Sequence, residues 1–239
     1  MWFFTADLHL NHSNIVKYCK RPFMNDLELN LLKMVDNGSI PINEVNISKE
    51  TTESMTDAII ESINHTVGKR DYLVIVGDFC YTRGKTRESD VGFLRKRIRC
   101  ENIFLILGNH DDRKICAKYF QCLENYTFNI DGQKIFVSHY PCRSWDKKMY
   151  GTWMLYGHVH GAFSYEDKNG ISKEREEEIK NYLLKYLDFD KSMDVMNHIK
   201  GTFSKSLTLD VGVDNKRENV TFGTPWSFED IKKYMNEQQ

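Results

Sequence analysis

The sequence has almost no net charge and no long apolar run. Its 239 residues carry 33 basic and 34 acidic side chains, a formal charge of -1, so composition indicates neither a polyanion-binding nor a membrane-surface protein. The longest purely apolar run is about six residues, far below the roughly 20 that a membrane-spanning helix needs. With 41% hydrophobic residues the composition is that of a globular domain, and we expect no membrane partner.

Disulfide patterns and export signals are also missing. The six cysteines form no Cys-x-x-Cys pair and are too few for a disulfide framework in so long a chain. The first residues have no basic segment and reach a carboxylate at Asp7, so we expect no secretory signal, reduced thiols and a cytoplasmic location. Only four prolines occur, and no linker, repeat or low-complexity tract divides the chain. We therefore expect a single domain over residues 1–239.

Short apolar segments predict the strands. Segments of about five β-branched or aromatic residues, each ended by polar residues or glycine, predict buried strands at 2–6, 72–76, 103–107 and 153–156. Residues 207–213 are a further strand candidate. The segments 126–130 and 134–138 flank Asp131-Gly132, a pair that favours a tight hairpin turn.

Helical spacing appears between these strands. It predicts helices at 13–19, 55–67, 114–120 and 227–235, the second of them with Ser54 as its cap. Strands that alternate with helices, followed by a hairpin-rich half, predict an α/β fold around a mixed sheet.

Two stretches, 24–53 and 165–204, fit this alternation poorly, and we interpret both as insertions on a common core. The first is polar and has little periodicity. The second contains a densely charged helix at 173–180, where Ile179, Leu183 and Leu187 share one face. A second short helix is predicted near 193–199.

Potential metal ligands follow the predicted strands. Five strands end in the carboxylate, imidazole or amide side chains of Asp7, His9, Asp78, Asn109, His139, His158 and His160. Because binding sites of α/β sheets lie at the C-terminal ends of the strands, we expect these side chains to meet. His158 and His160 are two residues apart, so on an extended segment both rings would point the same way. Glycines 77, 108 and 157 would permit close approach of backbone and metal.

This donor set suits two metal ions. Seven potential ligands are too many for one tetrahedral zinc, whereas a carboxylate can bridge two ions. Nitrogen and oxygen donors without a thiolate favour divalent manganese, iron, zinc, nickel or cobalt, and we expect manganese. Two ions about 3.5–4 Å apart stabilise both the attacking and the leaving oxygen of an in-line displacement at phosphorus.

The ordered motifs resemble those of the calcineurin-like metallophosphoesterase family. They are Asp7-Leu8-His9, Gly77-Asp78, Gly108-Asn109-His110-Asp111, His139 and Gly157-His158-Val159-His160. The opening segment 7–23 and the closing segment 209–228 resemble the compact bacterial and phage branch of that family. The resemblance implies a two-layered mixed β-sandwich flanked by helices, and it leaves out only 24–53 and 165–204.

The resemblance also implies a role for each motif residue. One divalent ion would be held by Asp7, His9, Asp78 and His160, and the other by Asp78, Asn109, His139 and His158. Asp78 would bridge the two ions. His110 would contact the phosphate and protonate the leaving oxygen, and Asp111 would orient His110. A metal-bridging hydroxide would attack phosphorus in line.

Three further residues are candidates for substrate contact. His12 lies three residues beyond His9, and Arg143 and Trp145 would bind phosphate and stack on a base or aryl group. We favour a phosphodiester substrate, either a nucleotide or a nucleic acid. Two alternatives stay open: a phosphomonoesterase or protein phosphatase with the same site, and a catalytically silent protein-interaction module.

Overall fold

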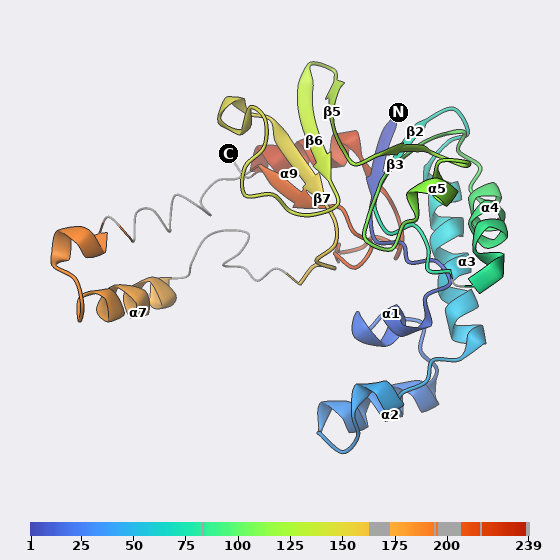
Figure 1. Ribbon diagram of the computed structural model, residues 1–239, viewed down its shortest axis with the longest axis horizontal. Coiled ribbons are helices and arrows are strands. Elements are labelled where there is room, and N and C mark those ends of the chain that lie inside the picture. The colour runs from blue at the N-terminus through green and yellow to red at the C-terminus, as the bar shows by residue number, and fades with distance from the viewer. Residues whose placement is uncertain (83, 163–172, 194, 196–206, 216, 238–239) are drawn as a thin grey trace.

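The computed structural model describes residues 1–82, 84–162, 173–193, 195, 207–215 and 217–237. Two β-sheets lie face to face with helices around them (Figure 1). The strand order is β4-β3-β2-β1-β9 in the first sheet and β5-β6-β7-β8 in the second. The predicted α/β class with two mixed layers is therefore confirmed.

The first sheet is mostly parallel. Its parallel strands are β1 (Trp2–Thr5), β2 (Tyr72–Val76), β3 (Asn102–Ile106) and β4 (Gln121–Leu123), and β9 (Trp226–Ser227) runs antiparallel to β1. Alternate side chains of β2 serve two cores, because Leu73 and Ile75 pack toward the helices while Val74 and Val76 pack toward the second sheet. Burial on both faces explains why these strands are continuous apolar runs.

The second sheet begins with the predicted hairpin. It contains β5 (Asn125–Ile130), β6 (Gln133–Ser138), β7 (Trp153–Tyr156) and β8 (Thr208–Asp210). Asp131 and Gly132 form the turn between β5 and β6 with φ values of 49° and 84°, as a tight hairpin turn requires. Strands β6, β7 and β8 run parallel to one another, so their C-terminal ends point the same way.

An apolar core joins the two sheets. It contains Phe4, Val74, Val76 and Ile106 from the first sheet and Ile135, Val137, Leu155 and Leu209 from the second. Full burial of each such side chain contributes roughly 1.5–3 kcal/mol. The C-terminal helix α9 (Phe228–Glu237) adds Phe228, Ile231 and Met235 to the same core. This packing holds the strand ends of both sheets in one place.

Helices cover the other face of the first sheet. They are α1 (Ser13–Tyr18), α3 (Lys49–Thr66), α4 (Arg87–Arg97) and α5 (Arg113–Cys116). Short 3-10 helices occur at Ile42–Glu44, Gly84–Thr86 and Lys148–Tyr150, the last of them in the connection between β6 and β7. Helix α3 starts a turn and a half earlier than the sequence indicated. Its cap is Ser48, whose hydroxyl accepts a hydrogen bond from the Thr51 amide at 3.1 Å, so the predicted cap at Ser54 is wrong.

Residues 24–53 contain an ordered helix, α2 (Asp26–Asp36). It starts with a capping box in which Asn25 and Glu28 each accept a hydrogen bond from the other's backbone amide, both at 3.0 Å. The Glu28 carboxylate also accepts hydrogen bonds from the Ser48 amide and the Thr51 hydroxyl. Glu28 thereby ties α2 to the start of α3. That 24–53 is an insertion stays a prediction.

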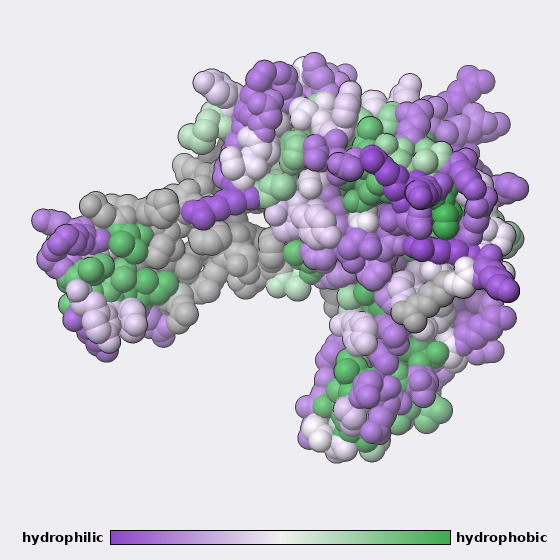
Figure 2. Space-filling view, in the orientation of Figure 1, coloured by the Kyte–Doolittle hydropathy of each residue, from purple (hydrophilic) through white to green (hydrophobic). Residues whose placement is uncertain are grey.

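The charged segment forms helix α7 (Lys173–Leu183), which lies apart from both sheets in Figure 1. Figure 2 shows hydrophobic side chains gathered on this part of the molecule, where Leu184 and Phe189 are exposed. Residues 189–193 are helical, whereas most of the predicted helix at 193–199 lies outside the described residues. Among the helices described, none is long and apolar enough to cross a membrane.

Candidate metal centre

The C-terminal ends of β1, β2, β3, β6 and β7 meet at one edge of the two sheets. Backbone hydrogen bonds fix their loops to one another, from Asp7 N to Gly77 O and from Gly157 N to His139 O, each 3.1 Å long. Another, from Val213 N to Ala6 O, joins the segment after β8 to the end of β1. The predicted ligands thus lie on loops that are anchored to both sheets.

The first predicted group of ligands comes together. Asp7, His9 and His160 each offer a ligand atom, and these atoms lie within 4.8 Å of one another. The Nε2 atom of His9 is 3.4 Å from Oδ2 of Asp78. Asp7, His9 and Asp78 are almost completely buried. The four side chains that the resemblance assigns to one ion therefore lie close together, and three of them are buried.

The second predicted group lies on the other side of Asp78. The same Oδ2 atom of Asp78 is 3.5 Å from Nε2 of His139. The amide oxygen of Asn109 is 3.1 Å from His139 Nε2 and 3.1 Å from His158 Nδ1. Asp78 thus stands between the two groups, which is where a bridging carboxylate is needed.

The side chains fit a divalent cation chemically. His9 Nε2 is buried and has no hydrogen-bond partner within the described part of the chain, an arrangement that is costly unless an ion takes that position. Burial, helped by the nearby positive charge of Arg21, lowers the pKa of His9, so its ring is neutral and carries a free lone pair.

The carboxylates at the site also indicate a cation site. Burial raises the pKa of Asp7 well above its ordinary value; His160 opposes this, while the carboxylates of Asp210 and Asp78 add to it. Two or more buried carboxylates at such short range repel each other, and a bound cation relieves that repulsion. The charges at the site therefore favour a bound cation, because the positively charged side chains nearby offset the carboxylates only in part.

Five of the seven predicted ligands have a left-handed backbone. The φ angles are 55° for Asp7, 49° for His9, 54° for Asp78, 70° for His158 and 51° for His160. Each such residue costs roughly 1–2 kcal/mol, and strain of this kind gathers at functional sites. The extended geometry expected for His158 and His160 is wrong, because both φ angles are positive; His158 contacts Asn109, whereas His160 lies with Asp7 and His9.

The glycines before the ligands make room for ligand side chains. A Cβ atom on Gly77 would lie 2.1 Å from Nδ1 of His139, and one on Gly108 would lie 2.2 Å from Oδ1 of Asp78. On Gly157 it would lie 2.5 Å from Oδ2 of Asp7. Each motif glycine thus lets a ligand from another loop pack directly against the backbone.

We expect Gly77→Ala to damage the site far more than Gly132→Ala. Both glycines have a left-handed φ, 90° and 84°, but a Cβ on Gly132 meets no atom within 4 Å. Both variants should lose roughly 1–2 kcal/mol of stability from backbone strain. Gly77→Ala should lose a further ~1–3 kcal/mol through its clash with His139, together with bound metal. Urea unfolding and metal content measure this, and equal losses in the two variants would contradict it.

His110 lies at the edge of the same site. Its amide donates a 2.9 Å hydrogen bond to Oδ1 of Asp78, and its half-buried ring lies 5.2 Å from the His9 ring. One of its ring nitrogens lies within 4.8 Å of ligand atoms of His9 and Asp78. This position suits a group that reaches a substrate bound at the metal centre.

Asp111, which the resemblance implies would orient His110, binds backbone amides. Its carboxylate accepts hydrogen bonds from the backbone amides of Asp78, Phe79 and Gly108, at 2.9, 3.0 and 2.9 Å. These bonds clamp the loop after β2 to the loop after β3. Asp111 therefore fixes the backbone on which Asp78 and His110 are mounted.

The three candidate substrate contacts have different surroundings. His12 is buried beside the centre, with Nδ1 3.2 Å from Nδ1 of His9 and its ring stacked on Tyr81. Arg143 is exposed. Trp145 is only 8% exposed and its Nε1 donates to the Thr152 carbonyl at 2.8 Å, so its ring serves packing and does not offer a face to a base. The predicted stacking role of Trp145 is therefore wrong.

Sequence reasoning missed two residues that contact the ligands. Arg21 and Asp214 stood in the segments that resemble the bacterial and phage branch, but no role was attached to them. His160 donates a 2.7 Å hydrogen bond from Nδ1 to Asp214. Burial alone would lower the pKa of His160, but this bond and the nearby Cys19 thiol raise it to about 10. Metal binding at His160 therefore displaces a proton.

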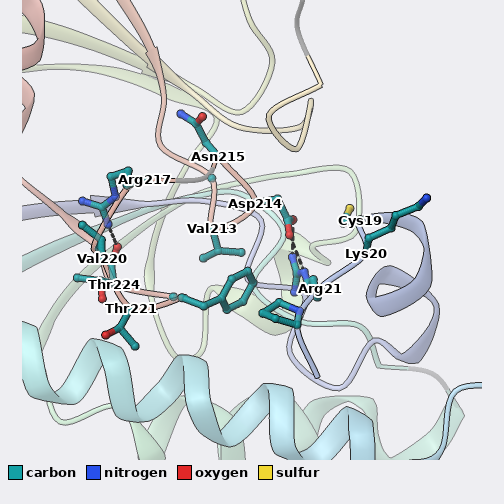
Figure 3. A pocket seen from close by; sticks show the side chains of 14 residues that line it. Cys19, Lys20, Arg21, Val213, Asp214, Asn215, Arg217, Val220, Thr221 and Thr224 are labelled. Atoms are coloured by element: carbon teal, nitrogen blue, oxygen red, sulfur yellow. Dashed lines mark hydrogen bonds and ion pairs between the residues drawn. The ribbon is translucent and has the colours of Figure 1, made fainter. Parts of the chain in front are cut away.

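A separate cavity of about 250 Å³ lies beside Arg21 and Asp214 (Figure 3). Arg21 and Asp214 form part of its wall, together with Cys19 and Phe222. None of the seven predicted metal ligands is among the described residues that line it. The chemistry of the centre is thus not located in this cavity.

A two-sheet fold that gathers carboxylate, imidazole and amide donors at one edge defines a class of metal-binding enzymes. The chain belongs to the calcineurin-like phosphoesterase family, whose model matches residues 3–221. The resemblance stated from the motifs is confirmed. The family is described as one of phosphoesterases.

Two individual proteins are similar to this one. An uncharacterised protein of Methanocaldococcus jannaschii is 27% identical over 155 residues, which is 65% of this chain and 66% of that protein, just under two thirds of its length. The crystal structure of a protein of unknown function from Aquifex aeolicus matches 98% of both chains with 17% identity and a TM-score of 0.53. The second similarity shows the fold alone.

Proposed function

We propose that this protein is a two-metal phosphoesterase whose favoured substrate is a phosphodiester, either a nucleotide or a nucleic acid. The observation that carries the proposal is the position of Asp78. One carboxylate oxygen lies 3.4 Å from His9 Nε2 and 3.5 Å from His139 Nε2, between two groups of nitrogen and oxygen donors. A single-ion site has no use for this second group.

In this proposal the chain holds two divalent ions, with manganese favoured. Asp7, His9, Asp78 and His160 hold one, and Asp78, Asn109, His139 and His158 hold the other. When bound, such a pair of ions activates water and neutralises the negative charge of the phosphoryl group. His110 contacts the phosphate and donates a proton to the leaving oxygen. Asp111 and the motif glycines keep these side chains in place.

The donor set serves monoesters and diesters alike, and the surroundings of the centre support a substrate that carries a base or an aryl group. Tyr140 is 48% exposed, and its ring lies 4.5 Å from the His158 ring and 5.0 Å from the His139 ring. An exposed aromatic ring beside the metal centre suits stacking on a base or an aryl leaving group. A cytoplasmic location is part of the proposal because the six cysteines are free thiols.

Hydrolysis of bis-p-nitrophenyl phosphate, compared with p-nitrophenyl phosphate, tests the proposal. The protein is stripped with a chelator, then reloaded with Mn²⁺ and assayed against both esters. We expect no activity in the stripped protein, and diester cleavage that returns with about two ions per chain. Cleavage of the monoester alone would favour the phosphatase alternative. Two bound ions with no turnover of either ester would favour a silent interaction module.

A further inference from the structure

We infer that Arg21 and Asp214 are positioning residues, which together fix His160 in place as a metal ligand and tie it to the loop that carries Asp7 and His9. This inference rests on the proposed metal centre. Neither residue belongs to the predicted ligand set, and nothing in the motif pattern assigns them a role. The inference starts from their contacts.

The contact between Asp214 and His160 selects the ring nitrogen that faces the metal. Nδ1 of His160 lies 2.7 Å from Oδ2 of Asp214, whose side chain is only 4% exposed. A carboxylate that accepts a hydrogen bond from the Nδ1 proton leaves Nε2 as the ring nitrogen that can bind an ion, which takes the place of the Nε2 proton. Carboxylates that hold a ligating imidazole in this way orient the ring and make it a better ligand.

Arg21 holds that carboxylate with a two-pronged contact. Its Nε donates to Oδ1 of Asp214 at 2.9 Å and its Nη2 donates to Oδ2 at 2.7 Å, and the Arg21 side chain is completely buried. Figure 3 shows the two side chains facing each other, joined by dashed lines. A planar guanidinium that engages both oxygens leaves the carboxylate little freedom to rotate.

The same guanidinium also holds the first metal-binding loop. Arg21 Nη2 donates to the carbonyl of Asp7 at 2.8 Å, and Nη1 donates to the carbonyl of Leu8 at 2.9 Å. Leu8 stands between Asp7 and His9, the two residues of this loop whose left-handed backbone places their side chains at the centre. One buried side chain therefore sets the distance between Asp7, His9 and His160. Lysine cannot replace it, because a single ammonium group does not make this set of contacts.

Manganese binding by Asp214→Asn tests the inference directly. An asparagine of the same shape has one acceptor oxygen in place of two, while both Arg21 and His160 remain donors. The variant is first stripped of metal with a chelator. Titration calorimetry with Mn²⁺ should then show that it binds one of two ions about 10–100-fold more weakly than the wild type does, with the affinity for the other ion unchanged. Asp57→Asn is the matched control, because it removes the charge of a carboxylate that pairs with Arg97 at 2.8 Å on the surface. It should leave both affinities unchanged.

The dependence of activity on Mn²⁺ concentration is a second measurement, and a purely structural role for Asp214 would not change it. At limiting Mn²⁺ the Asp214→Asn variant should be strongly impaired, and saturating Mn²⁺ should restore most of kcat. Asp214→Glu keeps the charge and should recover part of the lost affinity. If Asp214→Asn binds both ions as the wild type does, the inference is overturned. If the wild type binds no ion at all, the proposed function fails instead.

Nuclear magnetic resonance of the zinc-loaded wild type needs no variant and applies even if Asp214→Asn fails to fold. In ¹⁵N-labelled protein we expect His160 to carry its proton on Nδ1 and none on Nε2. A proton on Nε2 of His160 would overturn the inference.

Discussion

Asp78→Ala is expected to empty both metal positions and to abolish turnover. Its Oδ2 lies 3.4 Å from Nε2 of His9 and 3.5 Å from Nε2 of His139, and its Oδ1 accepts a hydrogen bond from the His110 amide. Removing it breaks both groups of ligands at once. Loss of the ions removes several kcal/mol of charge stabilisation, which corresponds to at least about a 10³-fold loss of kcat/KM.

Metal content by mass spectrometry and diester hydrolysis measure the effect. Asp78→Asn is the companion variant, because it keeps the size of the side chain and an acceptor for the His110 amide while it removes the charge. Asp57→Ala, a change at an exposed carboxylate of α3, is the control and should keep two ions. Retention of both ions by Asp78→Ala would show that the bridging assignment is wrong.

His110→Ala is expected to keep both ions and to lose turnover by about 10²–10⁴-fold, the usual contribution of a general acid. The contact that His110 makes with Asp78 comes from its backbone amide, so the alanine variant retains it. What disappears is the ring that lies 5.2 Å from His9 at the open edge of the site. The two variants thus separate metal binding from proton transfer.

Substrates with different leaving groups test the role of His110 further. p-Nitrophenolate leaves readily without a proton, whereas the alkoxide of a nucleoside does not. The loss in His110→Ala should therefore be larger for a dinucleotide than for bis-p-nitrophenyl phosphate. His65→Ala, which removes an exposed histidine of α3, is the control. The assignment fails if His110→Ala empties the site while Asp78→Ala does not.

Strands and helices followed from sequence where burial is complete. The segments 72–76 and 153–156 match β2 and β7 residue for residue, because continuous apolar runs mark strands buried on both faces. The edge strands β4 and β9 went unnoticed, since three and two residues are too short to show a period. Ser54 and Ser48 are equivalent as caps from sequence alone, and the contact of Glu28 with Ser48 and Thr51 favours the second.

Side-chain roles were harder to predict than side-chain positions. Asp111 stands next to His110 in sequence, yet its oxygens bind three backbone amides. Trp145 and Tyr140 are both aromatic residues near His139, and only the fold shows that Trp145 is buried while Tyr140 lies exposed beside His158. Adjacency in the chain says little about which way a side chain turns.

The sequence by itself determined the family, the class of fold and the residues that stand at the strand ends, because the spacing between an apolar strand and the polar residue that follows it is local. The tertiary structure alone decided how those residues are held. Arg21 meets Asp214 across 193 residues of chain, and Asp214 meets His160 across 54. Such contacts depend on the path of the whole chain through two sheets, and no local pattern carries that information.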